Sequence, residues 1–170
     1  MAELTQNERL QPSLLDRLTD DEPEVDRESR DKRVLSMRRL RECVLRDLSW
    51  LLNATRLDVL EDLEDYPLVA RSVVNYGMPD VAGLTASGLD VIALERAVRE
   101  AIIDFEPRIL ASTVKVTARS RPELMAHNTL AFDIEGELWA QPVPLRVYLK
   151  TELDLEIGEV KVSEISSQNR

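Results

Sequence analysis

The sequence predicts an α+β fold in which N-terminal helices pack on a small antiparallel β-sheet. Up to Pro107 the apolar residues recur at spacings of three and four, as on one face of a helix. Beyond Pro107 they alternate with polar residues, as in half-buried strands. The helical segments precede the strands instead of alternating with them, which is the order typical of an antiparallel sheet. The chain has 170 residues and no internal repeat, so one domain with a tail accounts for its length.

We expect residues 1–30 to form a flexible tail and residues 31–170 to form the folded domain. Residues 19–33 contain one apolar side chain, Val25, so this stretch cannot bury enough surface to offset its ordering entropy. Upstream lies a short apolar island made of Leu14, Leu15 and Leu18. Two interpretations of the island stay open. It is either a helical turn folded back on the domain or a tethered segment that orders on docking to a partner.

Two amphipathic helices are predicted. The first covers residues 31–53, and its apolar stripe consists of Val34, Met37, Leu40, Val44, Leu48 and Leu51. Its other faces carry a cluster of arginines, which is either a solvated face paired with neighbouring acids or a docking face for an acidic protein. The second helix covers residues 88–105, with Ser87 as its N-cap and Pro107 as the residue that ends it.

The connections and strands follow from the same patterns. Tyr66-Pro67 is predicted to break any helix, and residues 75–80 are predicted to form a turn. Alternation predicts strands over residues 114–118, 130–134, 145–149, 153–157 and 160–162, of which the third and fourth could be one long strand. Interruptions of strand pairing, which would leave backbone groups free for another chain, are expected at Gly136, Pro142 and Pro144.

Composition excludes several classes of function. The 22 basic and 32 acidic residues give a net charge of −10, which argues against a nucleic-acid binder because such a protein needs a basic face. One cysteine excludes an internal disulfide, and one histidine excludes the two-histidine zinc motifs. No apolar stretch approaches the roughly 20 residues that span a bilayer. We therefore expect an acidic, cytoplasmic protein with no transmembrane segment.

The sequence offers no catalytic or cofactor-binding motif. His127, the one imidazole, falls in a polar connection between strands and is best interpreted as a solvent-facing loop residue. Cys43 falls beside the stripe of the first helix and is interpreted as a buried structural thiol. No phosphate-binding glycine loop and no zinc protease motif is present. We therefore predict no cofactor, no metal and no enzymatic activity.

Glu106-Pro107-Arg108 is the most informative tripeptide. It stands between the second helix and the first strand inside an apolar frame, where a charged pair is costly unless the charges meet each other or a partner. In one interpretation Arg108 lies near the terminal carbonyls of the helix and Glu106 is solvated. In the other, a preorganised corner presents Arg108 for bidentate bonds to a partner. The sequence does not decide between them.

Six stretches carry a resemblance to a known family, in the right order along the chain. They are residues 14–18, 46–53, 72–80, 105–108, 134–144 and 151–155. In these stretches the chain resembles the TssE baseplate subunits of type VI secretion systems. That group belongs to the family founded on the gene-25 baseplate wedge protein of contractile-tailed phages, often labelled lysozyme-like. The resemblance implies a structural component with a gene-25-like fold.

The resemblance also implies partners. TssE subunits sit on the baseplate wedge with TssF, TssG and TssK and offer the first ring of sheath subunits, TssB and TssC, a template for assembly. The family's Glu-Pro-Arg motif maps onto Glu106, Pro107 and Arg108, which are implied to dock on the wedge and to start sheath assembly. Independently of the resemblance, a mobile tail could capture a second partner, and Leu14, Leu15 and Leu18 are the residues expected to bind it. The implied location is the inner face of the cytoplasmic membrane, reached only through the baseplate.

Two other functions remain as alternatives. A regulatory anti-adaptor, which shields a sigma factor from proteolysis, uses a similar domain and would need one tight partner. A peptidoglycan hydrolase would need two placed carboxylates, one of them desolvated, whereas most acids here fall in exposed registers. For the leading hypothesis, the sequence predicts that Arg108→Ala leaves the fold intact and abolishes sheath formation.

Overall fold

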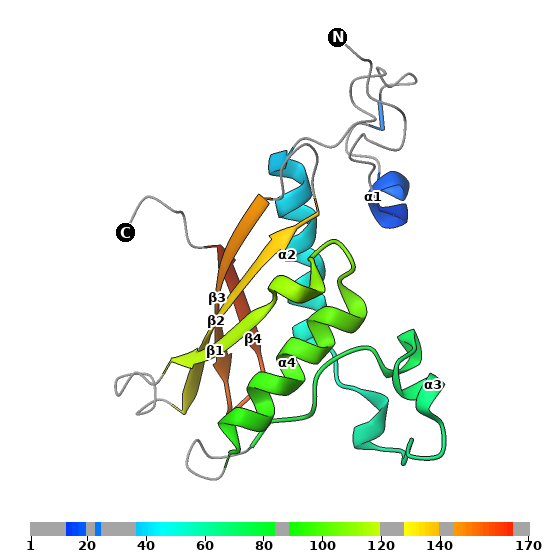
Figure 1. The fold of residues 1–170 in the computed structure, drawn as a ribbon, viewed down its shortest axis with the longest axis vertical. Helices are drawn as coiled ribbons and strands as arrows, with labels where there is room; N and C mark the ends of the chain where they lie inside the picture. The colour runs from blue at the N-terminus through cyan, green and yellow to red at the C-terminus, as the bar shows by residue number, and fades with distance from the viewer. Residues whose placement is uncertain are drawn as a thin grey trace.

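A computed structural model describes residues 13–19, 23–24, 37–83, 89–119, 128–139 and 145–164. Within them two long helices, α2 (Met37–Asn53) and α4 (Val91–Phe105), cover one face of a four-stranded sheet (Figure 1). The strands are β1 (Lys115–Arg119), β2 (Thr129–Leu138), β3 (Leu145–Asp154) and β4 (Val160–Glu164). Both helices precede the strands along the chain, so the predicted α+β class is confirmed.

The sheet has the strand order β1-β2-β3-β4, and every neighbouring pair is antiparallel. Its registers place Val116 opposite Ile134 and Ile134 opposite Leu149, on the face toward the helices. The other face carries charged side chains, for example Asp133 opposite Lys150. One face is thus packed and the other is polar, as the alternating pattern predicts.

The hydrophobic core lies between this sheet face and the two helices. α2 packs against β4, and α4 packs against β1. The fully buried apolar side chains with the largest volumes are Leu48, Leu51, Ile102, Leu138, Leu149 and Leu155. Cys43 is buried as a free thiol, as predicted, and burial raises its pKa. The core therefore joins both long helices to the sheet in one unit.

The helix boundaries differ from the predicted ones. α4 begins at Val91 and is capped by Asp90, whose carboxylate accepts the Ala93 N–H at 3.0 Å. Aspartate caps a helix as well as serine does, and the prediction of Ser87 did not consider Asp90. Ser87 lies outside the described residues, as do residues 25–36, where the first helix and the folded domain were predicted to begin.

The structure confirms some expectations about the connections and strands and corrects others. No helix passes through Tyr66-Pro67, as predicted, and a new one, α3 (Pro67–Ala70), begins at Pro67, because proline suits the first helical position. Gly136 pairs with Val147 inside β2 and does not interrupt it, while Pro142 and Pro144 lie outside the described residues. The predicted third and fourth strands are one strand that ends at Asp154, so residues 155–157 form a turn.

Residues 54–83 make an excursion between α2 and α4. It contains the single-turn helices η3 (Leu57–Val59), α3 and η4 (Val73–Asn75), and it projects away from the sheet (Figure 1). The excursion comes back to the end of α2 at Gly77, which has a φ of 130°. A Cβ at this position would lie 2.3 Å from the Ala54 carbonyl oxygen. Only glycine fits so close an approach.

Candidate functional site

The Glu106–Arg108 corner is held by backbone hydrogen bonds on both sides. α4 ends at Phe105, and the Glu106 N–H still donates to the Ile102 carbonyl at 2.9 Å. A short turn follows, and η5 (Ala111–Thr113) leads to β1. The Trp139 N–H donates to the Arg108 carbonyl at 2.7 Å, which ties the corner to the end of β2. The corner is therefore a rigid junction between α4 and the sheet.

Within the corner, Glu106 and Arg108 bind each other. Glu106 is only 3% exposed. Its carboxylate accepts the Arg108 backbone N–H at 3.1 Å, Nε at 2.7 Å and Nη2 at 2.5 Å. Nη2 also donates to Asp47 Oδ2 on α2 at 2.5 Å. Burial by itself lowers the pKa of Arg108, but the hydrogen bonds and charges of Glu106 and Asp47 raise it above its ordinary value.

This geometry corrects both interpretations of the tripeptide. Glu106 is buried and paired, not solvated, because the guanidinium satisfies its oxygens. Nor is the fork of Arg108 free to bind a partner carboxylate, since its Nε and Nη2 are already used inside the chain. Arg108 Nη1 is shielded and has no hydrogen-bond partner. The corner thus offers a partner a fixed shape rather than an open cation.

The tail leucines belong to helix α1 (Leu14–Leu18), which is anchored on α2 by charge. Asp16, whose side chain is 4% exposed, forms an ion pair with Arg46 at 2.8 Å and accepts the Ser13 hydroxyl at 2.6 Å. Burial by itself raises the pKa of Asp16, but hydrogen bonds from Ser13 and Arg46 outweigh it and lower the pKa to about 2. The island is therefore folded back on the domain.

A chain of alternating charges connects α1 with the corner. Arg46 bridges Asp16 of α1 and Asp47, at 2.8 Å and 2.7 Å, and Asp47 in turn binds Arg108. An open pocket of about 460 Å³ lies along this chain. Its lining consists of Ser13, Leu15, Asp47, Trp50, Leu51, Tyr76, Phe105, Glu106, Pro107 and Arg108. Four segments distant in sequence therefore meet at one site.

The structure unites only part of the predicted site. Leu15 lines the pocket together with Glu106, Pro107 and Arg108. The other two leucines do not line it: they are exposed on α1, Leu14 by 72% and Leu18 by 74%. α1 thus turns two of its three leucines toward solvent while Asp16 holds it in place.

Both edges of the sheet are partly blocked by side chains from the helices. Along the β1 edge α4 binds two backbone groups: Glu95 accepts the Ala118 N–H at 2.5 Å, and Arg99 donates to the Val114 carbonyl, just before β1, at 3.2 Å. A helix that satisfies an edge in this way prevents further strand pairing. α4 satisfies this edge only in part, because the Val116 backbone groups point the same way as those of Ala118 and bind no group in the described part of the chain.

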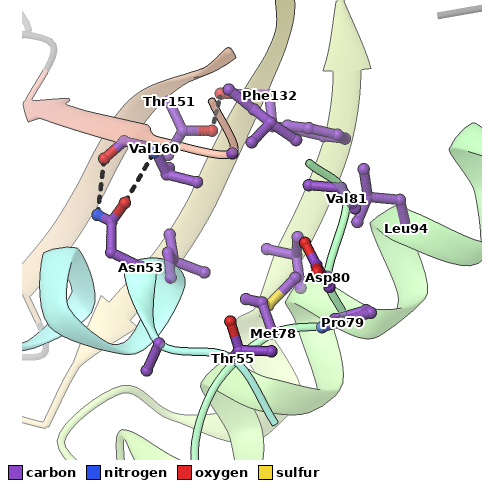
Figure 2. Close-up of a pocket in the computed structure, with 15 residues that line it drawn as sticks. Asn53, Thr55, Met78, Pro79, Asp80, Val81, Leu94, Phe132, Thr151 and Val160 are labelled. Carbon is purple, nitrogen blue, oxygen red and sulfur yellow. Dashed lines mark hydrogen bonds between the residues drawn. The ribbon is translucent and has the colours of Figure 1, made fainter. Parts of the chain in front are cut away.

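β4 is closed only at its beginning. Figure 2 shows Asn53 reaching from the end of α2 to Val160, where its amide donates to the carbonyl at 2.8 Å and accepts the N–H at 2.8 Å. Backbone groups alternate in direction along a strand, so Val162 also points its N–H and carbonyl away from β3. Within the described part of the chain no group binds them. β4 therefore keeps an open edge from Val162 onward.

Sequence reasoning missed Asp47, Asp16 and Asn53 as members of the site. All three fall inside stretches that carried the resemblance, which was the available signal. Their roles depend on which distant groups they meet, and no local pattern states that.

The described residues include no group of three or more metal-ligating side chains that could hold an ion. None of their helices is both long and apolar enough to cross a membrane.

The chain matches one family by sequence. The profile described as "Baseplate wedge protein gp25" matches residues 38–143, more than half of the chain, and this range includes α2, the corner and β2. No curated protein and no solved structure gives a significant match. The chain belongs to the gp25 baseplate wedge family, and it is a structural protein of the phage-tail-like baseplate type.

Proposed function

We propose that this chain is the TssE subunit of a type VI secretion baseplate, which sits on the wedge and templates the contractile sheath. Membership of the gp25 family and the ordered stretches from Leu14 to Leu155 support this assignment. The single observation that carries the sheath role is the open edge of β4 from Val162 onward. An unpaired edge accepts a strand from another chain through main-chain hydrogen bonds. TssB and TssC supply that strand.

The corner and α1 form the wedge-facing side of the proposal. Exposed Leu14 and Leu18 are apolar anchors, and the ion pairs beneath them fix the position of α1 relative to Glu106–Arg108. A rigid surface loses little conformational entropy on binding. TssF, TssG and TssK are its partners, and the protein works in the cytoplasm, at the inner face of the membrane. It needs no cofactor and catalyses no reaction.

The buried acids do not favour the hydrolase alternative. Among the described residues the carboxylates of Glu106 and Asp16 are both shielded from solvent, and both are already bound within the chain. Three N–H groups of Arg108 occupy the oxygens of Glu106. Ser13 and Arg46 bind Asp16. A general acid must present its proton to the substrate. Glu106 is instead a structural partner of Arg108.

Val162→Pro tests the sheath role. Proline removes an N–H that points away from β3, so the β3–β4 ladder keeps its bonds while an incoming strand loses one. We expect a folded protein that still binds TssF and TssG but supports no sheaths, seen by imaging fluorescent TssB in cells. Val162→Thr, which keeps the N–H, is the matched control. Normal sheaths with folded Val162→Pro would contradict the proposal.

A further inference from the structure

The excursion between α2 and α4 exposes apolar side chains that the fold does not use. Leu60, Leu68 and Val73 are exposed by 81%, 88% and 80%. With Tyr66 and Val74 they form what we call the apolar knob. None of residues 57–75 belongs to the hydrophobic core. Exposed apolar side chains gathered on one projection are typical of a protein–protein contact.

Polar bonds, not apolar packing, hold the knob in shape. Buried Asn75 donates to the Ala70 carbonyl at 2.8 Å and accepts the Asp58 N–H at 3.0 Å, so it fastens η3 to the α3–η4 segment. Arg56 pairs with Asp58 at 2.9 Å, and Arg71 pairs with Asp104 of α4 at 3.0 Å. The leucines and valines are thus left for another surface, on a platform that is already ordered.

Charge identifies the kind of surface that fits. Glu61, Asp62, Glu64 and Asp65 are exposed beside the knob, and none of them forms an ion pair with another described residue. The two arginines of the excursion are already paired within the chain. A partner that buries the knob must therefore bring its own cations.

We propose that the apolar knob docks into an apolar depression, rimmed by lysine and arginine, on another protein of the baseplate. This rests on the proposed function, which supplies the partners. An anionic lipid surface would repel the four carboxylates, and the acidic stretch 19–33 of this chain carries the same sign of charge. A second copy, with a net charge of −10, has the same disadvantage.

The test uses the full chain with purified TssF–TssG as the probe. Leu68→Glu with Val73→Glu places two charges on the knob, and we expect binding at least about tenfold weaker than that of the wild type. Ile92→Glu is the matched control, since Ile92 is equally an exposed apolar residue, 69% exposed, but lies in the first turn of α4. Its binding stays at the wild-type level.

A second variant tests the charges separately. This variant changes three acids together to lysine: Glu61, Glu64 and Asp65. The change leaves the hydrogen bonds of Asn75 untouched, so the variant still tests the docking proposal if the first variant does not fold. We expect this variant to bind more weakly than the wild type. We also expect the affinity of the wild type to fall between about 50 and about 300 mM NaCl, and the affinity of the variant not to fall.

Each result has a defined meaning. No binding of the wild type to TssF–TssG contradicts the proposed function itself. Wild-type binding that both folded variants retain overturns the knob proposal alone. The knob proposal is also overturned if the wild type forms a dimer that Leu68→Glu with Val73→Glu dissociates. It is equally overturned if the wild type binds anionic vesicles through the knob.

Discussion

At the scale of single residues, the corner derives its rigidity from a carboxylate that water does not reach. Glu106 would be costly to bury alone, and Arg108 makes its burial tolerable by satisfying both oxygens. Asp47 then balances the remaining charge of the guanidinium. The motif is therefore a structural unit before it is a binding surface, and substitutions in it affect both properties.

Arg108→Ala is expected to lower the free energy of unfolding by about 2–4 kcal/mol, because it leaves Glu106 buried without a cation. The prediction from the sequence alone, an intact fold, overlooks this burial. Glu106→Leu combined with Arg108→Met removes both charges and is expected to cost less than the single change. Urea unfolding of the three proteins measures the difference. An unchanged free energy in Arg108→Ala would contradict the pairing.

Asp16 makes the attachment of α1 sensitive to acid. Its pKa of about 2 in the folded chain lies below the ordinary value of about 3.9, so its contribution is fully present above about pH 4 and is lost as the pH falls through about 2. In a Trp139→Phe background, emission of Trp50, which lies beside α1 in the pocket, reports detachment. Asp16→Asn is expected to show the detached signal already at pH 7. An unchanged spectrum in that variant would count against the anchor.

At the scale of elements, a glycine in β2 allows the segment that follows the corner to pack closely against the strand. Gly136 lies on the face toward the helices, and a Cβ there would be 2.9 Å from Ile109 Cγ2. The Ile109 backbone pairs with Leu138 in an isolated bridge, so it cannot easily withdraw. What looked like an interruption of the strand is a point of close packing.

Gly136→Ala is therefore expected to destabilise the protein by about 1–3 kcal/mol through overpacking. Ile109→Ala removes the clashing methyl and leaves a cavity of its own. The double variant should cost less than the sum of the two single changes, which thermal unfolding of all four proteins measures as a coupling energy. Strict additivity would show that the side chains do not meet.

At the scale of the whole molecule, the proposed contacts lie on separate elements. The open edge belongs to β4, the charged corner joins α4 to β2, and the knob projects from the excursion between the helices (Figure 1). The core between α2, α4 and the sheet holds the edge and the corner relative to each other, and the Arg71–Asp104 ion pair connects the knob to α4. A scaffold of this form can bind several partners at fixed angles.

A chain beginning at residue 31 is expected to fold on its own. α1 contributes no fully buried residue, and Arg46 keeps Asp47 when Asp16 is removed. We expect one cooperative transition and a loss of about 1–2 kcal/mol, because the lowered pKa of Asp16 means that its bonds to Ser13 and Arg46 contribute to stability. Calorimetry of the full and shortened chains makes the comparison. A broad or absent transition would show that the tail is part of the domain.

The sequence by itself determined the fold class, the two long helices and the alternating strands. Each of these depends on a local period, 3.6 residues or 2, and the hydrophobic effect acts on that period directly. The end of α4 before Pro107 followed from the chemistry of one residue, and the family followed from ordered stretches of sequence.

Only the tertiary structure decided which groups meet. Asp16, Asp47 and Arg108 are far apart along the chain, and their pairing depends on how α1, α2 and α4 pack. The same holds for Asn53 at β4 and for the clamp of Glu95 on β1. A sequence shows that a side chain can form a hydrogen bond, but packing at long range selects the partner. The open edge and the apolar knob therefore became visible only in three dimensions.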